Sequence, residues 1–289
     1  MSYTDLYLTK SPMISYQGKD KDPVALVFGV PFDSTCSYRP GTRFGPNAIR
    51  NAFQNIEVYS TRYNVDLERV TIEDLGNLKP TMNPSVMVDA VGKITQELLA
   101  KNKQLVVLGG EHLLTFGAFT SMPSNTGYVV FDAHYDLRDE YGDMKLSHAA
   151  YLRRIIEKRG SANIVHVGAR SYTAEELDFK NKMNLNSISD KELRNGSGTK
   201  LLKDAISNLD DLYISIDLDV LDPTFAPGVS NPEPFGLMAQ QLLELVYALE
   251  EKKVKCFDIV ELSPPYDNGT TASMAAKLMA EIICMSMKH

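Results

Sequence analysis

Short apolar runs rich in β-branched and aromatic residues alternate along the chain with amphipathic stretches. Runs of this kind are typical of parallel strands, because helices cover both faces of such strands and leave no exposed polar side. The runs that predict strands are 24–28, 105–108, 128–131, 164–167, 212–216 and 257–260.

The stretches between these runs predict helices. After Asn83 and Pro84, which suit an N-cap and a first helical position, apolar residues recur at helical spacing at Met87, Val91 and Ile94. Similar stripes predict helices over 236–253 and 271–285. Strands that alternate with helices predict an α/β fold with a mostly parallel sheet and right-handed crossovers. No linker, charge block or repeat divides the sequence, so we expect a single domain over residues 1–289.

Composition narrows the class of protein. The 289 residues carry 37 acidic and 30 basic side chains, a formal charge of −7, which argues against nucleic acid or an anionic membrane as a partner. Three cysteines without a CxxC pair suggest neither a disulfide framework nor a zinc–thiolate site. The first ten residues lack the pattern of a signal peptide and no apolar run approaches a membrane span. We therefore expect a cytoplasmic protein with no membrane partner.

Polar residues follow directly after four of the predicted strands. In an open parallel sheet, the carboxyl ends of the strands are where binding sites form. The four segments are Gly109-Gly110-Glu111-His112, Asp132-Ala133-His134-Tyr135-Asp136, Asp217-Leu218-Asp219 and Glu261. Side chains alternate along extended backbone, so we expect the His and Asp residues of each segment to point to one side.

Imidazole and carboxylate groups without a thiolate form a ligand set that favours Mn²⁺, with Zn²⁺, Fe²⁺ or Co²⁺ less favoured. Two histidines and four aspartates are too many for one catalytic ion and suit a two-metal centre with bridging carboxylates. The candidate ligands are His112, Asp132, His134, Asp136, Asp217 and Asp219. A single Asp-x-Asp after a strand is more often a turn or cap, so the prediction depends on the joint occurrence of three such strand ends.

The charge of this centre points to a class of substrate. Two divalent ions balance the four aspartates, and a water that bridges the ions is acidified to hydroxide, which leaves the centre with one negative charge. Such a centre favours a cationic or neutral electrophile over a phosphate ester. A guanidinium group fits, and Glu261 is a suitable carboxylate to pair with it.

Other residues leave alternatives open. His148 follows Ser147, a good N-cap, and either transfers protons near the metals or lies on the surface at a helix start. The helix dipole would lower the pKa of His148 and the negative metal centre would raise it. His166, inside a strand, favours a structural role. The loop 38–46, with Arg39 and Arg43, either borders the site or is purely structural.

Several segments resemble the ureohydrolase family, which contains arginase and agmatinase. They are YRPGTRFGPNAIR (38–50), LGGEH (108–112), DAHYDLRDEY (132–141), SHAAYLRR (147–154), SIDLDVLDPTFAPGVSNPEPFGL (215–237) and DIVELSPPYD (258–267). The resemblance implies a three-layer α/β/α fold with a parallel eight-stranded sheet and two Mn²⁺ ions at its strand ends. It also implies a homo-oligomer, a trimer or hexamer.

Matching positions imply a role for each site residue. One manganese would be bound by His112, Asp132, Asp136 and Asp217, and the other by His134, Asp132, Asp217 and Asp219, so that Asp132 and Asp217 bridge. His148 matches the histidine assigned to proton transfer, and Glu261 matches the acid that orients the guanidinium. The metals and Asp219 would stabilise the tetrahedral intermediate formed when the bridging hydroxide attacks the guanidinium carbon.

Within the family, LRDEY, YRPGTRFGP and SPPYD are more similar to agmatinase than to arginase. Agmatine lacks the carboxylate of arginine, so its far end is an ammonium. Asp139 and Glu140 could favour that ammonium, whereas Arg138, or Arg39 or Arg43, could equally hold a carboxylate.

The prediction is therefore a manganese-dependent agmatinase that converts agmatine to putrescine and urea. Its alternatives are arginase, guanidinobutyrase, an aminopropyl-agmatine ureohydrolase and a non-catalytic regulator of the polyamine pathway.

Overall fold

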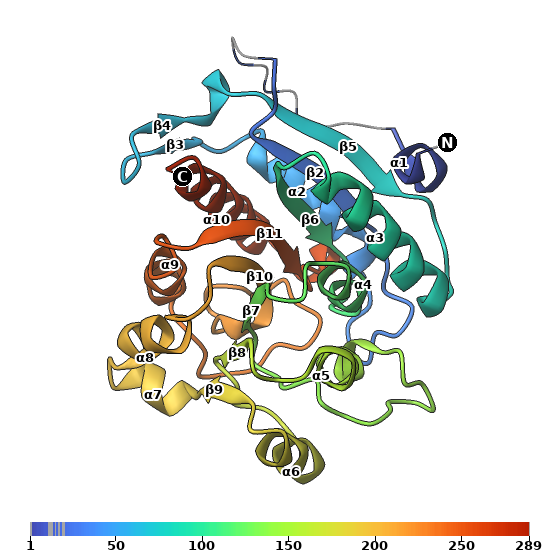
Figure 1. The fold of residues 1–289 in the computed structure, drawn as a ribbon, viewed down its shortest axis with the longest axis vertical. Coiled ribbons are helices and arrows are strands. Elements are labelled where there is room, and N and C mark those ends of the chain that lie inside the picture. The colour runs from blue at the N-terminus through green and yellow to red at the C-terminus, as the bar shows by residue number, and fades with distance from the viewer. Residues whose placement is uncertain (1, 11–13, 15, 17, 19–20, 289) are drawn as a thin grey trace.

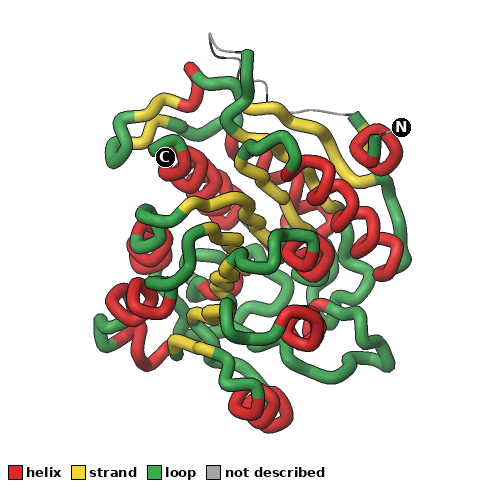
Figure 2. The backbone as a smooth tube through the Cα atoms, viewed as in Figure 1, coloured by secondary structure: helices red, strands yellow, loops and turns green. Residues whose placement is uncertain are grey.

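A nine-stranded sheet lies between two layers of helices in the computed structural model, which describes residues 2–10, 14, 16, 18 and 21–288. Figures 1 and 2 show the sheet running through the middle of the molecule. The strands in spatial order are β1 (Leu8–Thr9), β5 (Ile72–Leu78), β2 (Ala25–Val30), β6 (Gln104–Gly109), β11 (Lys253–Val260), β10 (Asp211–Asp217), β7 (Gly127–Phe131), β8 (Ile164–Val167) and β9 (Asn186–Ile188).

All neighbouring strands of this sheet pair in parallel except the short edge strand β1, which is antiparallel to β5. The parallel α/β fold predicted from the sequence is confirmed, with β1 as an added ninth strand. A separate antiparallel pair is formed by β3 (Tyr59–Ser60) and β4 (Val65–Asp66).

Two helical layers cover the sheet, one on each side in Figure 1. One layer contains α1 (Tyr3–Tyr7), α3 (Pro84–Leu99), α4 (Leu114–Thr120), α5 (Tyr151–Arg159) and α6 (Ala174–Lys182). The other contains α2 (Gly45–Phe53), α7 (Asp190–Arg194), α8 (Gly198–Ala205), α9 (Ala239–Tyr247) and α10 (Thr270–Ser286). Short 3₁₀ turns are η1 (Thr42–Phe44), η2 (Leu67–Arg69), η3 (His148–Ala150), η4 (Leu218–Val220) and η5 (Pro264–Tyr266).

The central strands are buried on both faces because alternate residues enter two different cores. On β6, Val106 and Leu108 belong to the core under one helical layer, and Leu105 and Val107 to the core under the other. All six predicted strands are present. Within the nine-stranded sheet, the strands that were not predicted lie toward its edges, and the longest of them, β5, carries Glu, Asp, Gly and Asn among its seven residues.

Helix boundaries follow local signals where the sequence offers them. The Asn83 side chain accepts hydrogen bonds from the N–H groups of Ser85 and Val86, so α3 begins at Pro84 as predicted. The helix predicted over 236–253 is shorter, from Ala239 to Tyr247. The first residues of the predicted range stay outside the helix, because Leu237 pairs with Leu221 in an isolated β-bridge. At the other end of the range, Lys253 already belongs to β11.

The described part of the chain contains no helix with the length and apolar character that a membrane span requires. The three cysteines form no disulfide: Cys256 and Cys284 are buried thiols, and Cys36 is half-buried.

A fully buried ion pair attaches α2 to the edge of the sheet. The Arg50 guanidinium donates to both carboxylate oxygens of Asp74 on β5, at 2.8 and 2.9 Å, and to the Gly76 carbonyl and the Asn77 side chain. Both charged side chains are completely buried. A buried pair of this kind is costly to break because one charge is left without its partner.

We expect Arg50→Met to lower the free energy of unfolding by about 3–5 kcal/mol, because Asp74 would keep a buried charge without its cation. Urea unfolding followed by circular dichroism measures the change. The control is Arg69→Ala, which removes a largely exposed partner of Asp66 and should cost no more than about 1 kcal/mol. Equal losses in the two variants would contradict the role of the buried pair.

Candidate metal centre

Four strands that are neighbours at the centre of the sheet, β6, β11, β10 and β7, deliver the predicted site residues. His112 follows β6, Glu261 follows β11, Asp217 ends β10 and Asp132 follows β7. Because these strands are parallel and adjacent, their carboxyl ends meet at one edge of the sheet. Residues more than a hundred positions apart in sequence are thereby brought together.

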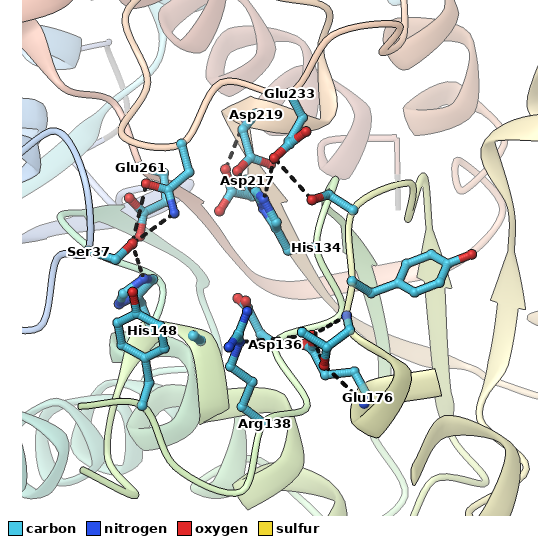
Figure 3. A pocket seen from close by; sticks show the side chains of 16 residues that line it. Ser37, His134, Asp136, Arg138, His148, Glu176, Asp217, Asp219, Glu233 and Glu261 are labelled. Carbon is cyan, nitrogen blue, oxygen red and sulfur yellow. Dashed lines mark hydrogen bonds and ion pairs between the residues drawn. The ribbon is translucent and has the colours of Figure 1, made fainter. Parts of the chain in front are cut away.

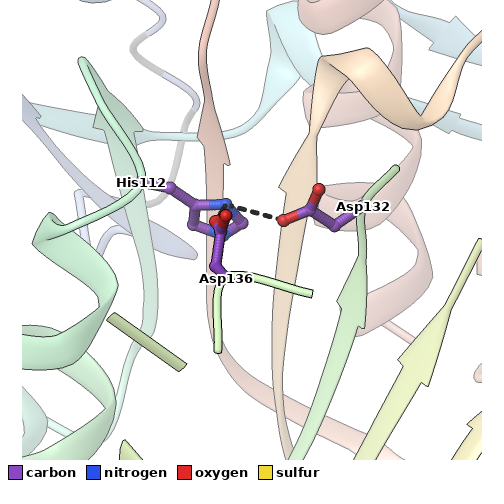
Figure 4. Close-up of side chains that lie close together, drawn as sticks. All are labelled: His112, Asp132 and Asp136. Atoms are coloured by element: carbon purple, nitrogen blue, oxygen red, sulfur yellow. Dashed lines mark ion pairs between the residues drawn. The ribbon is translucent and has the colours of Figure 1, made fainter. Parts of the chain in front are cut away.

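Two groups of side chains in this edge have the composition of metal sites. One consists of His112, Asp132 and Asp136 (Figure 4), and the other of Asp132, His134 and Asp219; the candidate ligand atoms within each group lie within 4.8 Å of one another. Asp132 belongs to both groups. Its Oδ2 lies 3.1 Å from His112 Nδ1 and its Oδ1 lies 3.6 Å from His134 Nδ1.

The other predicted ligands lie beside these two groups, with Asp217 near His112 rather than between the two histidines. Asp217 Oδ2 lies 3.1 Å from His112 Nδ1, and Asp219 Oδ2 lies 3.0 Å from His134 Nδ1. Asp136 Oδ2 is 3.8 Å from His112 Nδ1. The structure therefore gathers all six predicted ligands in two adjoining clusters that share a carboxylate.

Local hydrogen bonds, not strand alternation, orient these side chains. The sequence predicts that the alternation of side chains along extended backbone orients them. This prediction is wrong, because β7 ends at Phe131 and Leu218–Val220 forms a 3₁₀ turn. The N–H of His134 donates to Asp132 Oδ1 at 2.7 Å, and the N–H of Asp219 donates to Asp217 Oδ1 at 2.9 Å. Each Asp-x-His or Asp-x-Asp segment thus curls back on its own first carboxylate.

Backbone strain is also concentrated here. Asp136 and Glu261 both have left-handed backbone, with φ of 53° and 65°. Such conformations cost of order 1–3 kcal/mol for residues other than glycine and persist where the surroundings impose them, often at functional sites. They aim both carboxylates toward the same cavity.

The hydrogen bonds around His112 show that the site suits a cation. Its Nε2 lies 2.8 Å from the Ser215 hydroxyl, which donates its own hydrogen to Asp258 Oδ1 at 2.5 Å, so Nε2–H must be the donor to Ser215. Neutral His112 therefore presents an unprotonated Nδ1. This Nδ1 and Asp132 Oδ2 are buried and have no hydrogen-bond partner, as expected of atoms that bind a metal ion.

His134 is held in the same way. Its Nε2 faces Glu233 Oε1 at 3.4 Å, and Glu233 also accepts from the Ser171 hydroxyl at 3.0 Å. Nδ1 of His134 is thus the atom turned toward Asp132 and Asp219. Such outer contacts fix which ring nitrogen is available to a metal.

The carboxylates of the two clusters repel one another. Burial and the charge of Asp132 raise the pKa of Asp136 well above its usual range. Burial, with the charges of Asp219 and Asp132, does the same for the pKa of Asp217. Divalent cations would relieve this repulsion, so the donor atoms, their burial and their charge all fit two divalent ions.

A cavity of about 280 Å³ opens onto these clusters (Figure 3). Besides metal-ligand candidates, its lining is rich in polar groups from loops that follow the strands. The lining residues are Ser37, His134, Asp136, Arg138, Tyr141, His148, Ala149, Ser171, Tyr172, Thr173, Glu176, Asp217, Asp219, Asn231, Glu233 and Glu261.

His148 and Glu261 both reach this cavity. Ser147 caps the short turn η3 by accepting from the Ala149 N–H, as the sequence suggested, and His148 is buried rather than a surface residue. Burial lowers the pKa of His148 to about 4 and raises the pKa of Glu261 to about 7. Glu261 Oε1 accepts from the His112 N–H at 2.8 Å, which fixes its carboxylate beside the metal clusters.

Other candidates from the sequence lie elsewhere. Neither Asp139 nor Glu140 lines the cavity; the Asp139 carboxylate instead pairs with Arg154 at 3.0 Å and Arg153 at 3.4 Å. In the 38–46 loop, Arg43 pairs with Asp33, while Arg39 lies near the rings of Tyr38 and Tyr266.

The structural role favoured for His166 agrees with its surroundings. The ring is fully buried, and its Nε2 donates to the His134 carbonyl at 2.7 Å.

Two acidic residues of the cavity were not singled out in the sequence. Glu233 lies in the segment 215–237 that carries the family resemblance, so its signal was available as part of a motif. Glu176 lies on α6, where it forms a capping box with Thr173. Because a capping box is an ordinary helix start, nothing in its pattern indicated a place in the site.

A parallel α/β sheet with two carboxylate–histidine clusters at its strand ends is the architecture of an α/β enzyme whose strand ends could hold metal ions. The chain belongs to the arginase family, because the sequence model of that family, described as "Arginase family", matches residues 24–285.

Individual relatives agree with this assignment. The chain is 34% identical to an agmatinase of Halalkalibacterium halodurans over 98% of this chain and 99% of that protein. It is 36% identical to an N(1)-aminopropylagmatine ureohydrolase of Thermococcus kodakarensis over 88% of each chain. The crystal structure of the agmatine ureohydrolase of Thermoplasma volcanium superposes with a TM-score of 0.90 and 34% identity, covering 97% of this chain and 95% of that one.

The family and its agmatinase relatives identify the chain as a hydrolase that acts on amidino C–N bonds. Recognition of the family and the enzyme class predicted from the sequence are thereby confirmed.

Removing the shared carboxylate should disrupt both clusters. We expect Asp132→Ala to lose both metal ions and Asp136→Ala to retain about one, because Asp132 faces both histidines and Asp136 faces only His112. Metal per chain, measured by inductively coupled plasma mass spectrometry after dialysis, checks this. Full metal content in the Asp132 variant would refute the assignment.

Asp258 acts on the metal centre through Ser215 and His112, while its other oxygen accepts from Thr115 and Tyr213. Asp258→Asn weakens the Asp258–Ser215–His112 chain, so we expect a 10- to 100-fold loss of metal affinity, the usual range for such outer contacts. Calorimetric titration of metal-stripped protein with Mn²⁺ measures it. The control is Glu281→Gln, another buried carboxylate, bonded to Ser60 and Tyr247 away from the site; comparable losses in both variants would argue against the role.

Proposed function

We propose that this chain is a manganese-dependent agmatinase that hydrolyses the guanidinium group of agmatine to putrescine and urea. The observation that carries the proposal is the charge of the cavity. Three glutamates, Glu176, Glu233 and Glu261, line it in addition to the metal-ligand candidates, and Arg138 is the one lysine or arginine among the described lining residues.

The guanidinium end of the substrate is assigned to the inner part of the cavity. Glu261 is buried beside the two clusters of metal-ligand candidates, and its carboxylate accepts a hydrogen bond from the His112 N–H. A carboxylate in this position pairs with a guanidinium through two parallel hydrogen bonds and directs the carbon of that group toward the metals. The pKa of Glu261 near 7 falls when a cation binds beside it.

The outer part of the cavity favours a cationic tail. Glu176 is a buried carboxylate and Glu233 is half-buried, while the guanidinium of Arg138 lies 3.9 Å from Glu176 and near the Tyr141 ring. The positive charge of Arg138 is therefore partly balanced before any ligand enters. A tail with an ammonium meets a net negative wall there, whereas the carboxylate of arginine would face two glutamates. Glu176 and Glu233, the outer wall of the cavity, thus take the role of favouring the ammonium that was predicted from the sequence for Asp139 and Glu140.

The two ions, when bound, would supply an activated water at neutral pH. The side chains of the chain then supply the rest. Glu261 orients the guanidinium, and His148 transfers a proton to the leaving amine. Because burial keeps His148 neutral at pH 7, its imidazole can take up a proton and release it again within the cavity.

A second candidate is hydrolysis of N(1)-aminopropylagmatine, favoured by the 36% identity to the Thermococcus kodakarensis relative with that name. That substrate carries two cationic nitrogens beyond its guanidinium, which also suits an acidic wall. The metal identity, the homo-oligomeric state and the cytoplasmic location remain predictions alongside the substrate.

Urea release from the manganese-loaded protein tests the proposal. We expect agmatine to be hydrolysed with a kcat/KM at least about tenfold above that for arginine or guanidinobutyrate, because charge mismatches at a tail are worth a few kcal/mol. We also expect its kcat/KM to exceed that for N(1)-aminopropylagmatine. Glu261→Gln should lower kcat/KM for agmatine about 100-fold while metal content stays unchanged. Preference for another compound would change the substrate, and no urea from any of the four would overturn the proposal.

A further inference from the structure

Thr35 makes two contacts with the proton-transfer histidine. Its hydroxyl oxygen accepts from the His148 N–H at 3.1 Å and lies 3.3 Å from His148 Nδ1. All of these groups are buried. Thr35 lies in the loop after β2 and belongs to none of the segments that carry the family resemblance, so it comes to His148 from a separate part of the chain.

A buried carboxylate that the proposed reaction does not use lies on the other side of Thr35. Glu111 is almost completely inaccessible to solvent, and both of its carboxylate oxygens accept hydrogen bonds from Thr35. The Thr35 N–H donates to Oε2 at 2.8 Å and the Thr35 hydroxyl donates to Oε1 at 2.5 Å. Glu111 thus holds both the backbone and the side chain of Thr35.

The hydrogen bonds that link Glu111, Thr35 and His148 determine which ring nitrogen of His148 carries its hydrogen. A hydroxyl has one hydrogen, and that of Thr35 goes to the Glu111 carboxylate, so Thr35 acts only as an acceptor toward His148 while Glu111 is ionised. Nδ1 must then carry the hydrogen of the neutral imidazole. Nε2 is left unprotonated, 3.1 Å from the hydroxyl of Ser37, a residue that lines the cavity.

We propose that Thr35, fixed by Glu111, is a positioning residue that holds His148 as the Nδ1–H tautomer and directs Nε2 toward the substrate. The inference rests on the proposed function for the direction of proton transfer. Nε2 accepts the proton that the attacking water gives up, which forms the imidazolium, and then donates that proton to the leaving amine nitrogen as the C–N bond breaks. Nδ1–H stays bonded to Thr35 throughout, so the imidazole returns to its starting form.

Three variants test this role with whichever guanidino compound the wild-type protein hydrolyses fastest. Thr35→Val keeps the shape but removes the acceptor, and we expect kcat to fall at least about tenfold with little change in KM. The limb of the pH profile that reports His148 should move to lower pH, because the imidazolium loses its partner. Thr35→Ser restores the hydroxyl and should recover most of the wild-type kcat.

Glu111→Gln probes the direction of the hydrogen bonds. The Thr35 N–H requires the amide oxygen of the new side chain, so the amide N–H₂ faces the Thr35 hydroxyl and turns its hydrogen toward His148 Nδ1. We expect this variant to favour the Nε2–H tautomer and to lose kcat as Thr35→Val does. Each variant should keep the metal content of the wild type, which separates the effect from damage to the neighbouring ligand His112.

The tautomer is measured without turnover by ¹⁵N NMR of the protein loaded with diamagnetic Zn²⁺, with the His148 signal identified by its loss in His148→Gln. The wild type and Thr35→Ser should show Nδ1–H, and Glu111→Gln should show Nε2–H. An Nε2–H tautomer in the wild type, or wild-type kcat in Thr35→Val, would overturn the inference. A wild type that releases no urea refutes the proposed function, whereas the NMR result still decides the role of Thr35.

Discussion

The site depends on one electrostatic constraint: four aspartates are buried together at the ends of neighbouring strands. Asp132, Asp217 and Asp219 are almost fully inaccessible, and Asp136 is buried beside them. Buried carboxylates this close cannot all remain charged without cations. The sheet order β6-β11-β10-β7 sets their separation. A fold that concentrates negative charge in this way is suited to binding cations at this edge of the sheet.

Hydrogen bonds on the far side of the two histidine rings fix which ring nitrogen faces the aspartates. Both rings turn Nδ1 inward because their other nitrogen is engaged, by Ser215 and Asp258 behind His112 and by Glu233 beside His134. Tyr151 also stacks on the His112 ring with centroids 4.1 Å apart, which limits its rotation. The ligand atoms are therefore oriented before a metal binds, so less conformational entropy is lost on binding.

Much of the fold and of the metal clusters was predictable, because both leave local marks in the sequence. A buried parallel strand is a run of apolar residues, and a strand-end ligand is the polar residue that follows it, as at Phe131 and Asp132. Strand β5 was not predictable because polar residues interrupt its apolar run: Glu73 is exposed, whereas Asp74 is buried in its ion pair with Arg50. Glu176 and Thr35 were missed for a different reason: each reaches the site from another part of the chain, and such long-range packing has no local pattern.

Glu233 shows that substrate selection and metal binding are not separable in this site. The same carboxylate accepts a hydrogen bond from His134, whose Nδ1 faces one metal cluster, and lines the outer wall that a cationic tail would meet. A positive tail beside Glu233 weakens the hold of that carboxylate on the His134 N–H, since one negative charge is shared between two donors. The basicity of a metal ligand therefore changes with the charge of the bound tail. Under the proposed function, a cavity with a neutral tail would leave Glu233 wholly to His134, so the charge of the tail and the basicity of His134 are linked through this one carboxylate.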